Sequence, residues 1–213
     1  MEWKIIPCSH HTKTLKDRLL DILVDMPTLL GESKFLQSCE DLDMQSFYRQ
    51  NSLHNCRSWD KKLTEWQADI SSSGESRVLD PGISVSSHVM DVASAQIITL
   101  YWATSIILHS IMGTVTRPAI WRSDIKYYCR RIIRTALILF HPAVGAFRTH
   151  LATFPMTVAI THLSVFEPKE RDAEQQLLGN CFMKPEGATI GLFLKAWRLM
   201  PGNISPRAKG FMN

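Results

Sequence analysis

Four histidines are the side chains of this chain best suited to acid-base chemistry, because an imidazole exchanges a proton near neutral pH. They lie within apolar segments, at His109, His141, His150 and His162. Carboxylates to work beside them would have to come from the ends of the chain, since residues 125–166 contain no Asp or Glu. A single histidine on an apolar face is more often a hydrogen-bonded core residue. A catalytic histidine stays open, but we assign none.

The sulfur and imidazole ligands for a metal ion are sparse. The dense cluster of Cys8, His10 and His11 lacks the second pair of ligands that a tetrahedral zinc site needs. The five cysteines form no CxxC pair and are odd in number, which favours reduced thiols inside a cell; they are Cys8, Cys39, Cys56, Cys129 and Cys181. Cys129 falls on an apolar stripe and is expected to be inert. We predict no metal and no cofactor.

Sequence motifs for catalysis are missing as well. The chain has no GxxxxGK[ST], GxGxxG, GxSxG or HExxH pattern, so the common phosphate cradle, dinucleotide turn, nucleophile elbow and zincin helix are not indicated. We predict that the protein is not an enzyme, with no catalytic, cofactor-binding or metal-ligating residues.

One charged pattern has a regular spacing. Basic residues recur every four positions and so follow one ridge of a helix: Arg122, Lys126, Arg130 and Arg134. The ridge is either an electrostatic footprint for an acidic partner or phosphate, or a solvated face paired with acids of the first helices. The second interpretation is favoured because the first 80 residues hold 13 acids against 10 bases.

The elements that position these residues are organised around residues 92–115, which carry no charge. A helix that is hydrophobic all round must be enclosed by other helices or by lipid. Its polar residues favour packing against helices; they are Gln96, Thr99, Thr104, Ser105, His109 and Ser110. Residues 147–166, with Pro155 near the start or at a kink, form a second apolar helix that we expect to pack against the first.

Amphipathic helices are expected to cover these two. The first follows Thr12 or Thr14 as its cap and kinks or ends near Met26, because of Pro27, with Gly31 as a terminal glycine. Its apolar face is predicted to hold Leu15, Leu19, Ile22, Leu23, Met26 and Leu30. The second spans residues 34–70, broken near 51–55, and its stripe of Cys56, Trp59, Leu63, Trp66 and Ile70 is predicted to be buried.

The remaining elements complete an all-α, irregular multi-helix bundle around two apolar central helices. Residues 71–91 are rich in Ser, Gly and Pro and predict a loop, and Ser123 is expected to cap a helix over 124–140. Residues 170–182 and 189–200 predict two further helices. We expect residues 1–11 to be an N-terminal tail, 12–200 a single all-helical domain, and 201–213 a mobile tail.

Composition is that of a globular chain. It has 213 residues, 45% hydrophobic and 21% charged, with a formal net charge of +4. The start has an acid at Glu2 and too short an apolar run for a signal peptide. We therefore expect an intracellular protein.

Several stretches together resemble the C-terminal regulatory region of fungal binuclear zinc-cluster transcription factors. The resemblance covers about residues 15–200 and rests on an order of aromatic and apolar residues. The segments are Cys56-Arg-Ser-Trp-Asp-Lys-Lys-Leu-Thr-Glu-Trp66, Leu100-Tyr-Trp-Ala-Thr-Ser-Ile-Ile-Leu-His109, Tyr128-Cys-Arg-Arg-Ile-Ile-Arg134 continuing to Phe154-Pro-Met-Thr-Val-Ala-Ile160, and Gly187-Ala-Thr-Ile-Gly-Leu-Phe-Leu194.

The resemblance implies a helical regulatory domain of a nuclear protein, with cytoplasm as the alternative location, tied to metabolic or secondary-metabolite genes. Such proteins carry a six-cysteine DNA-binding module, which this sequence lacks. We therefore expect no sequence-specific DNA binding by this chain alone, no membrane, and action through protein partners, either the transcription machinery or a homologous regulator; a small-molecule effector stays open. The alternatives are an accessory or biosynthetic protein of a fungal gene cluster and a membrane-associated helical protein.

Overall fold

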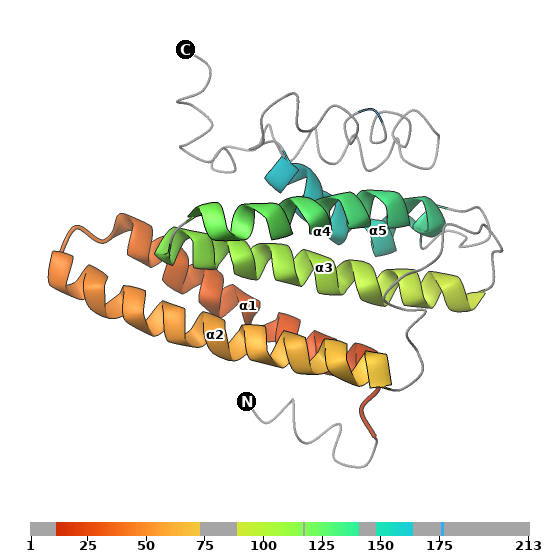
Figure 1. Cartoon of the computed structure of the whole chain (residues 1–213), viewed down its shortest axis with the longest axis horizontal. Coiled ribbons are helices and arrows are strands. Elements are labelled where there is room, and N and C mark those ends of the chain that lie inside the picture. Colours follow the sequence, from red (N-terminus) through yellow and green to blue (C-terminus); the bar gives the residue numbers. More distant parts are fainter. Residues whose placement is uncertain (1–11, 73–88, 117, 141–147, 164–175, 177–213) are drawn as a thin grey trace.

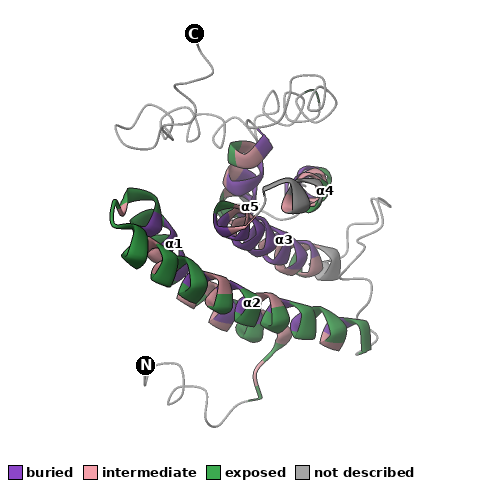
Figure 2. Cartoon of the chain, turned by 60° about the vertical axis from the view of Figure 1, so that its left-hand side comes forward, coloured by how far each residue is buried: buried purple, intermediate pink, exposed green. Residues whose placement is uncertain are grey.

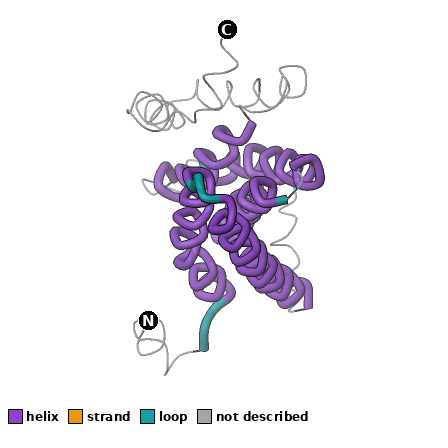
Figure 3. The backbone as a smooth tube through the Cα atoms, turned by 90° about the vertical axis from the view of Figure 1, so that its left-hand side faces the viewer, coloured by secondary structure: helices purple, strands orange, loops and turns teal. Residues whose placement is uncertain are grey.

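The computed structural model describes residues 12–72, 89–116, 118–140, 148–163 and 176. Over these residues the fold is all-α, as predicted, with five helices and no strand (Figure 3). The helices are α1 (Leu15–Ser38), α2 (Leu42–Ser72), α3 (Val89–Val115), α4 (Pro118–Leu139) and α5 (Arg148–Leu163).

Helix α3 is the centre of the bundle, because it packs against each of the other four helices (Figure 1). α1 and α2 lie on one side of it, and α4 and α5 on the other. Most of its residues from Ala95 to Met112 are buried. Within the described residues, Val92–Val115 is the one segment long and apolar enough to cross a membrane, and 67% of its most apolar window is buried within the bundle.

Three buried hydroxyls of α3 form their hydrogen bonds within the helix. The hydroxyls of Thr99, Thr104 and Ser105 donate to the carbonyl oxygens four residues earlier, at 2.8, 2.8 and 3.0 Å. Hydroxyls that bond back to their own helix can be buried without a partner on a neighbouring helix. The polar residues therefore do not by themselves decide what encloses α3.

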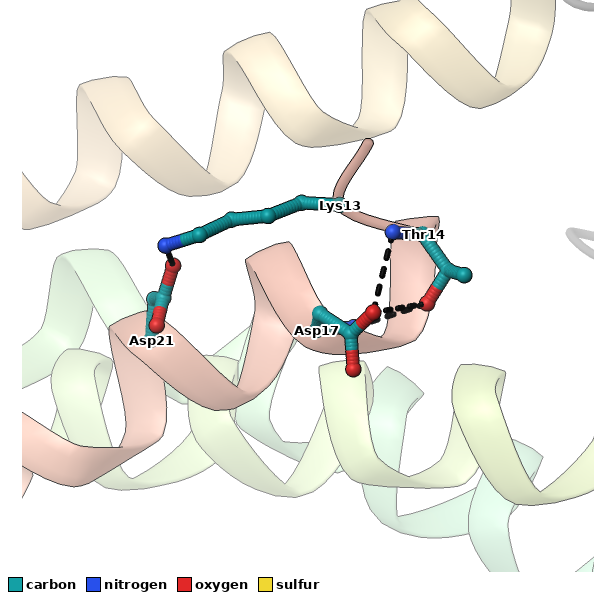
Figure 4. Close-up of polar contacts among 4 residues, drawn as sticks. All are labelled: Lys13, Thr14, Asp17 and Asp21. Carbon is teal, nitrogen blue, oxygen red and sulfur yellow. Dashed lines mark hydrogen bonds and ion pairs between the residues drawn. The ribbon is translucent and has the colours of Figure 1, made fainter. Parts of the chain in front are cut away.

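Helix α1 begins with a capping box, which selects Thr14 over Thr12 as the cap (Figure 4). The Asp17 amide donates to Thr14 Oγ1 at 3.2 Å, and the Thr14 amide donates to Asp17 Oδ2 at 3.0 Å. The Thr14 hydroxyl also donates to Asp17 Oδ2, at 2.6 Å, and the bonds that this carboxylate accepts from the Thr14 hydroxyl and amide lower the pKa of Asp17. The Lys13 ammonium pairs with Asp21 at 2.6 Å, one turn further along α1. Reciprocal bonds of this kind set the first residue of a helix.

The expectation that α1 ends near Met26 is wrong, while a kink there stays a prediction. The helix continues through Pro27 and Gly31 to Ser38. Proline removes one backbone hydrogen bond, but Met26 and Leu29 on either side of it are buried, and their packing outweighs that loss. Leu30, expected on the apolar face, is 47% exposed, and Leu29 takes the buried position instead.

Helix α2 also differs from expectation, since it starts at Leu42 and runs unbroken through residues 51–55. Ser52 is buried at the position four residues before Cys56 and so extends the buried stripe. Asn55 donates to Glu32 of α1 at 3.1 Å. Contacts across the two helices hold together a stretch whose composition alone suggested a break. Trp59 and Trp66 are buried, as predicted.

Helix α4 starts at Pro118, six residues before the predicted start, so Ser123 is not its cap. Proline suits the first turn, because its missing N–H would have no partner there. α3 begins at Val89 and α2 ends at Ser72, which makes the predicted loop 71–91 shorter at both ends. The predicted stripe of α4 is buried at Cys129 and beyond it.

Helix α5 packs on α3, as expected for the second apolar segment, and also on α4. Pro155 lies inside it. Several predictions fall outside the described residues and stay predictions; they concern the tail 1–11 with Cys8, His10 and His11, His141, Cys181, the helices 170–182 and 189–200, and the tail 201–213.

Candidate functional site

The end of α1 and the start of α2 expose large apolar side chains. Seven of the nine exposed large hydrophobic residues in the described part of the chain lie between residues 20 and 47. We call five of these the tip surface, namely Leu30, Phe35, Leu42, Met44 and Phe47. Leu42 is 78% and Phe47 65% exposed. The outward sides of α1 and α2 are correspondingly exposed in Figure 2. Apolar residues grouped in this way mark an interaction surface.

Two aromatic residues of the tip surface, one from each helix, are linked by Tyr48. The ring of Tyr48 meets Phe35 of α1 edge-on, with ring centroids 4.8 Å apart, and meets Phe47 at 5.6 Å. Asp41 holds the start of α2, because its Oδ1 accepts from the amides of Asp43 at 2.9 Å and Met44 at 3.1 Å. The exposed side chains are therefore presented on regular, capped helices.

The surroundings of the tip surface are acidic. Residues 20–48 contain six acids and one base, a net charge of −5 in a chain whose total is +4. The acids are Asp21, Asp25, Glu32, Glu40, Asp41 and Asp43, and the base is Lys34. Asp21 is paired with Lys13 of the same helix, and the remaining excess of negative charge favours partners of the opposite sign.

A second candidate is the buried polar cluster around His109, where α2, α3 and α4 approach one another. The His109 Nε2 lies 3.8 Å from Asp60 Oδ1. Its ring lies 4.8 Å from that of Trp121 and 5.8 Å from that of Tyr128. Burial lowers the pKa of His109, while Asp60 and Asp124 oppose that shift. The Nδ1 atom is buried and has no hydrogen-bond partner among the described residues.

Aromatic residues extend this cluster toward α2. Tyr101 stacks on Trp66, with centroids 5.1 Å apart, and its hydroxyl donates to Gln67 Oε1 at 2.9 Å. Burial raises the pKa of both Tyr101 and Tyr128, so both phenols are neutral at physiological pH. The enclosed imidazole has a carboxylate and two aromatic rings beside it, which suits a structural role.

A hollow lies between α1 and α2, away from the His109 cluster. It has a volume of about 220 Å³ and is lined by Arg18, Asp21, Ile22, Lys62, Glu65 and Trp66. Arg18 pairs with Asp69 near its rim. Its wall has charged residues of both signs but no histidine or cysteine. Across the described residues no group of three or more His, Cys, Asp or Glu could hold a metal ion.

The remaining histidines and cysteines are not brought together. His150 is exposed and His162 is partly buried on α5, where burial lowers the pKa of His162 to about 4. Cys56 and Cys129 are fully buried, as expected for Cys129. Burial raises the pKa of Cys56 to about 11, so the thiol stays protonated and unreactive.

The predicted basic ridge on α4 is partly built into the bundle. Lys126 and Arg130 are half-buried and Arg134 is exposed. Arg131, which the four-residue spacing leaves out, places its guanidinium 5.2 Å from the ring centre of Trp102 and 5.8 Å from that of Tyr127. A cation over an aromatic face stabilises packing between α3 and α4.

The sequence analysis missed the tip surface and the partners of His109. A predicted helix over residues 34–70 places Phe35 and Phe47 on one element, whereas they end one helix and begin the next. The sequence signal that could have indicated the tip surface is a group of apolar residues among acids, Leu42, Met44 and Phe47. Asp60 and Trp121 lie far from His109 in the sequence and meet it only in the folded chain.

The fold and these surfaces define a helical bundle with an exposed acidic and apolar end. Comparison of the chain with known protein families, with curated proteins and with solved structures gives no match.

Proposed function

We propose that this chain is a helical regulatory domain that controls transcription by binding protein partners in the nucleus, and that it is not an enzyme. The observation that carries the proposal is the tip surface, where two packed helices present apolar side chains in acidic surroundings. The resemblance of four segments to the regulatory region of zinc-cluster transcription factors supports the same function.

The apolar group at the tip is costly to expose in water, at about 25 cal/mol for each Å². A partner that covers it recovers this free energy, and the anchor residues of protein interfaces are commonly aromatic or large aliphatic side chains. Phe35, Leu42 and Phe47 are the side chains that we expect a partner to cover.

A tethering experiment tests the function. The full chain is fused to a heterologous DNA-binding domain, and transcription from a reporter with the matching site is measured. We expect the fusion to change transcription at least about fivefold. The triple variant Phe35→Ser, Leu42→Ser, Phe47→Ser is expected to lose most of this change, because the three side chains are exposed. Since Phe35 also contacts Tyr48 of α2, circular dichroism checks that the variant keeps its helices.

The matched control is Phe154→Ser, which removes an exposed aromatic of α5 far from the tip. It is expected to keep the effect on the reporter. A stably expressed nuclear fusion that leaves the reporter unchanged would contradict the regulatory role. A triple variant as active as the parent would show that the tip surface does not carry the function.

A further inference from the structure

The outer face of α1 is an apolar stripe on the opposite side from the core. The stripe residues are spaced four, seven and four positions apart, so they lie on one side of the helix. They are Leu20, Val24, Gly31 and Phe35. The buried residues occupy the other side, at Leu19, Ile22, Met26, Leu29, Ser33 and Leu36. The helix is therefore apolar on two faces, and α2 and α3 cover only one of them.

The stripe has the length and shape to receive another helix. From Leu20 to Phe35 it spans sixteen residues, a rise of about 22 Å at 1.5 Å per residue. Gly31 lies in the stripe, and no atom is found within 4 Å of where its Cβ would be. A residue without a side chain lets a second helix approach closely, toward the short end of the 8 to 10 Å range of helix packing distances.

Acids line one flank of the stripe. Asp21, Asp25 and Glu32 each follow directly after a stripe residue, and so lie on the same flank. Glu32 accepts a hydrogen bond from Asn55, which shows that this flank faces α2. Glu40, Asp41 and Asp43 continue the negative charge to the tip surface.

We propose that the stripe and the tip surface together bind an amphipathic α-helix of a partner protein, one with an apolar face and lysine or arginine residues along its edge. The inference rests on the proposed function, because it names the class of partner for the same surface. In helix-in-groove binding of this kind, the bound helix inserts apolar anchor residues spaced three, four and seven positions apart. Its basic edge would complement the net charge of −5 on residues 20–48.

The charge argues against two other occupants. A second copy of the chain would bring two surfaces of −5 against each other, and like charges at an interface are repelled. An anionic membrane surface would be repelled for the same reason. Among partners that offer an apolar face, a basic helix is therefore the one that the charges favour.

The test is a binding titration of the full chain with a labelled, helix-forming peptide of 18 residues that has leucines on one face and lysines along the edges. Fluorescence anisotropy is measured at 50 mM and 500 mM salt. We expect saturable binding that weakens at least about tenfold at the higher salt, because screening shortens the reach of exposed charges. A peptide with glutamate in place of each lysine is expected not to bind.

Two variants locate the site. Leu42→Ser with Phe47→Ser is expected to weaken binding at least about tenfold, the usual loss for an interface anchor. Glu40→Gln with Asp43→Asn is expected to weaken binding and reduce its salt dependence, while Glu65→Gln, an exposed acid of α2, is expected to change neither. Circular dichroism checks that each variant keeps its helices.

Several results would overturn the inference. The first two are equal binding of the lysine and glutamate peptides, and peptide binding that is unchanged in the tip variants. The other two would identify a different occupant of the surface: self-association of the chain that Phe47→Ser abolishes, or binding of the chain to neutral lipid vesicles that the same variant abolishes. If the lysine peptide does not bind while the tethered reporter still depends on the tip surface, only the proposal of a basic helix as the partner is rejected. If the peptide binds and the reporter does not respond, the regulatory proposal falls instead.

Discussion

The indole Nε1 of Trp66 donates a hydrogen bond to the carbonyl oxygen of Leu15 at 2.8 Å. The bond joins the last turns of α2 to the first turn of α1, 51 residues earlier in the chain. Trp66 is only 1% exposed and stacks on Tyr101 of α3. One side chain thus links three helices, and it does so by packing and by a hydrogen bond at once.

Truncation of this side chain is expected to be severe. Trp66→Ala should lower the free energy of unfolding by about 3 to 5 kcal/mol, as large core aromatics do. Trp66→Phe keeps part of the packing and loses the hydrogen bond, and should cost less. Urea denaturation followed by circular dichroism measures both. If Trp66→Ala melted within a degree or two of the parent, this side chain would not be a core residue.

Replacement of Gly31 is expected to stabilise the chain. Gly31 lies inside α1, and a Cβ there would meet no other atom. Gly31→Ala should raise the free energy of unfolding by about 0.5 to 1 kcal/mol, because alanine loses less backbone freedom on folding and favours the helix. Thermal unfolding measures the change. A lower melting temperature would indicate that α1 does not continue through this residue.

Acid is expected to destabilise the bundle through two histidines, because desolvation in the fold lowers their pKa values. His162 has a pKa of about 4 in the folded chain, and burial also lowers the pKa of His109. The unfolded chain therefore binds these protons first as the pH falls. The free energy of unfolding should be highest above pH 6.5 and fall toward pH 4, by at most about 3 kcal/mol for His162.

The histidine variants separate this effect from other titrations. His162→Gln should flatten the fall of stability between pH 6.5 and 4, whereas His54→Gln, at an exposed position of α2, should leave it unchanged. Denaturant titrations at half-unit steps of pH give the slope. Equal slopes for the parent and His162→Gln would mean that His162 is not buried in its neutral form.

Buried thiols are expected to resist modification. Cys56 and Cys129 are fully buried, and the pKa of Cys56 is raised to about 11. An alkylating reagent at pH 8 should therefore label Cys39 at least about a hundred times faster than either, because the thiolate is the reactive form and must be accessible. Peptide mapping by mass spectrometry measures the three rates. Comparable rates without denaturant would show that the core opens at these positions.

The sequence by itself determined the class of fold, because the period of the apolar residues is a local property. The stripe from Cys56 to Ile70 follows the helical spacing, and Trp59 and Trp66 are buried as that spacing requires. The uncharged stretch of residues 92–115 had to be enclosed, and α3 indeed packs against every other described helix. Thr14 and Asp17 have the three-residue separation of a capping box, so the start of α1 was also accessible from sequence.

Tertiary structure alone decided where the helices end and which residues share a site. Pro27 and the polar stretch 51–55 looked like breaks, but packing of α1 against α2 and α3 outweighs these local preferences. The approach of Asp60 and Trp121 to His109 depends on the arrangement of three helices. The exposure of Phe35, Leu42 and Phe47 has the same origin, since an amphipathic pattern does not say which apolar face the rest of the fold will cover.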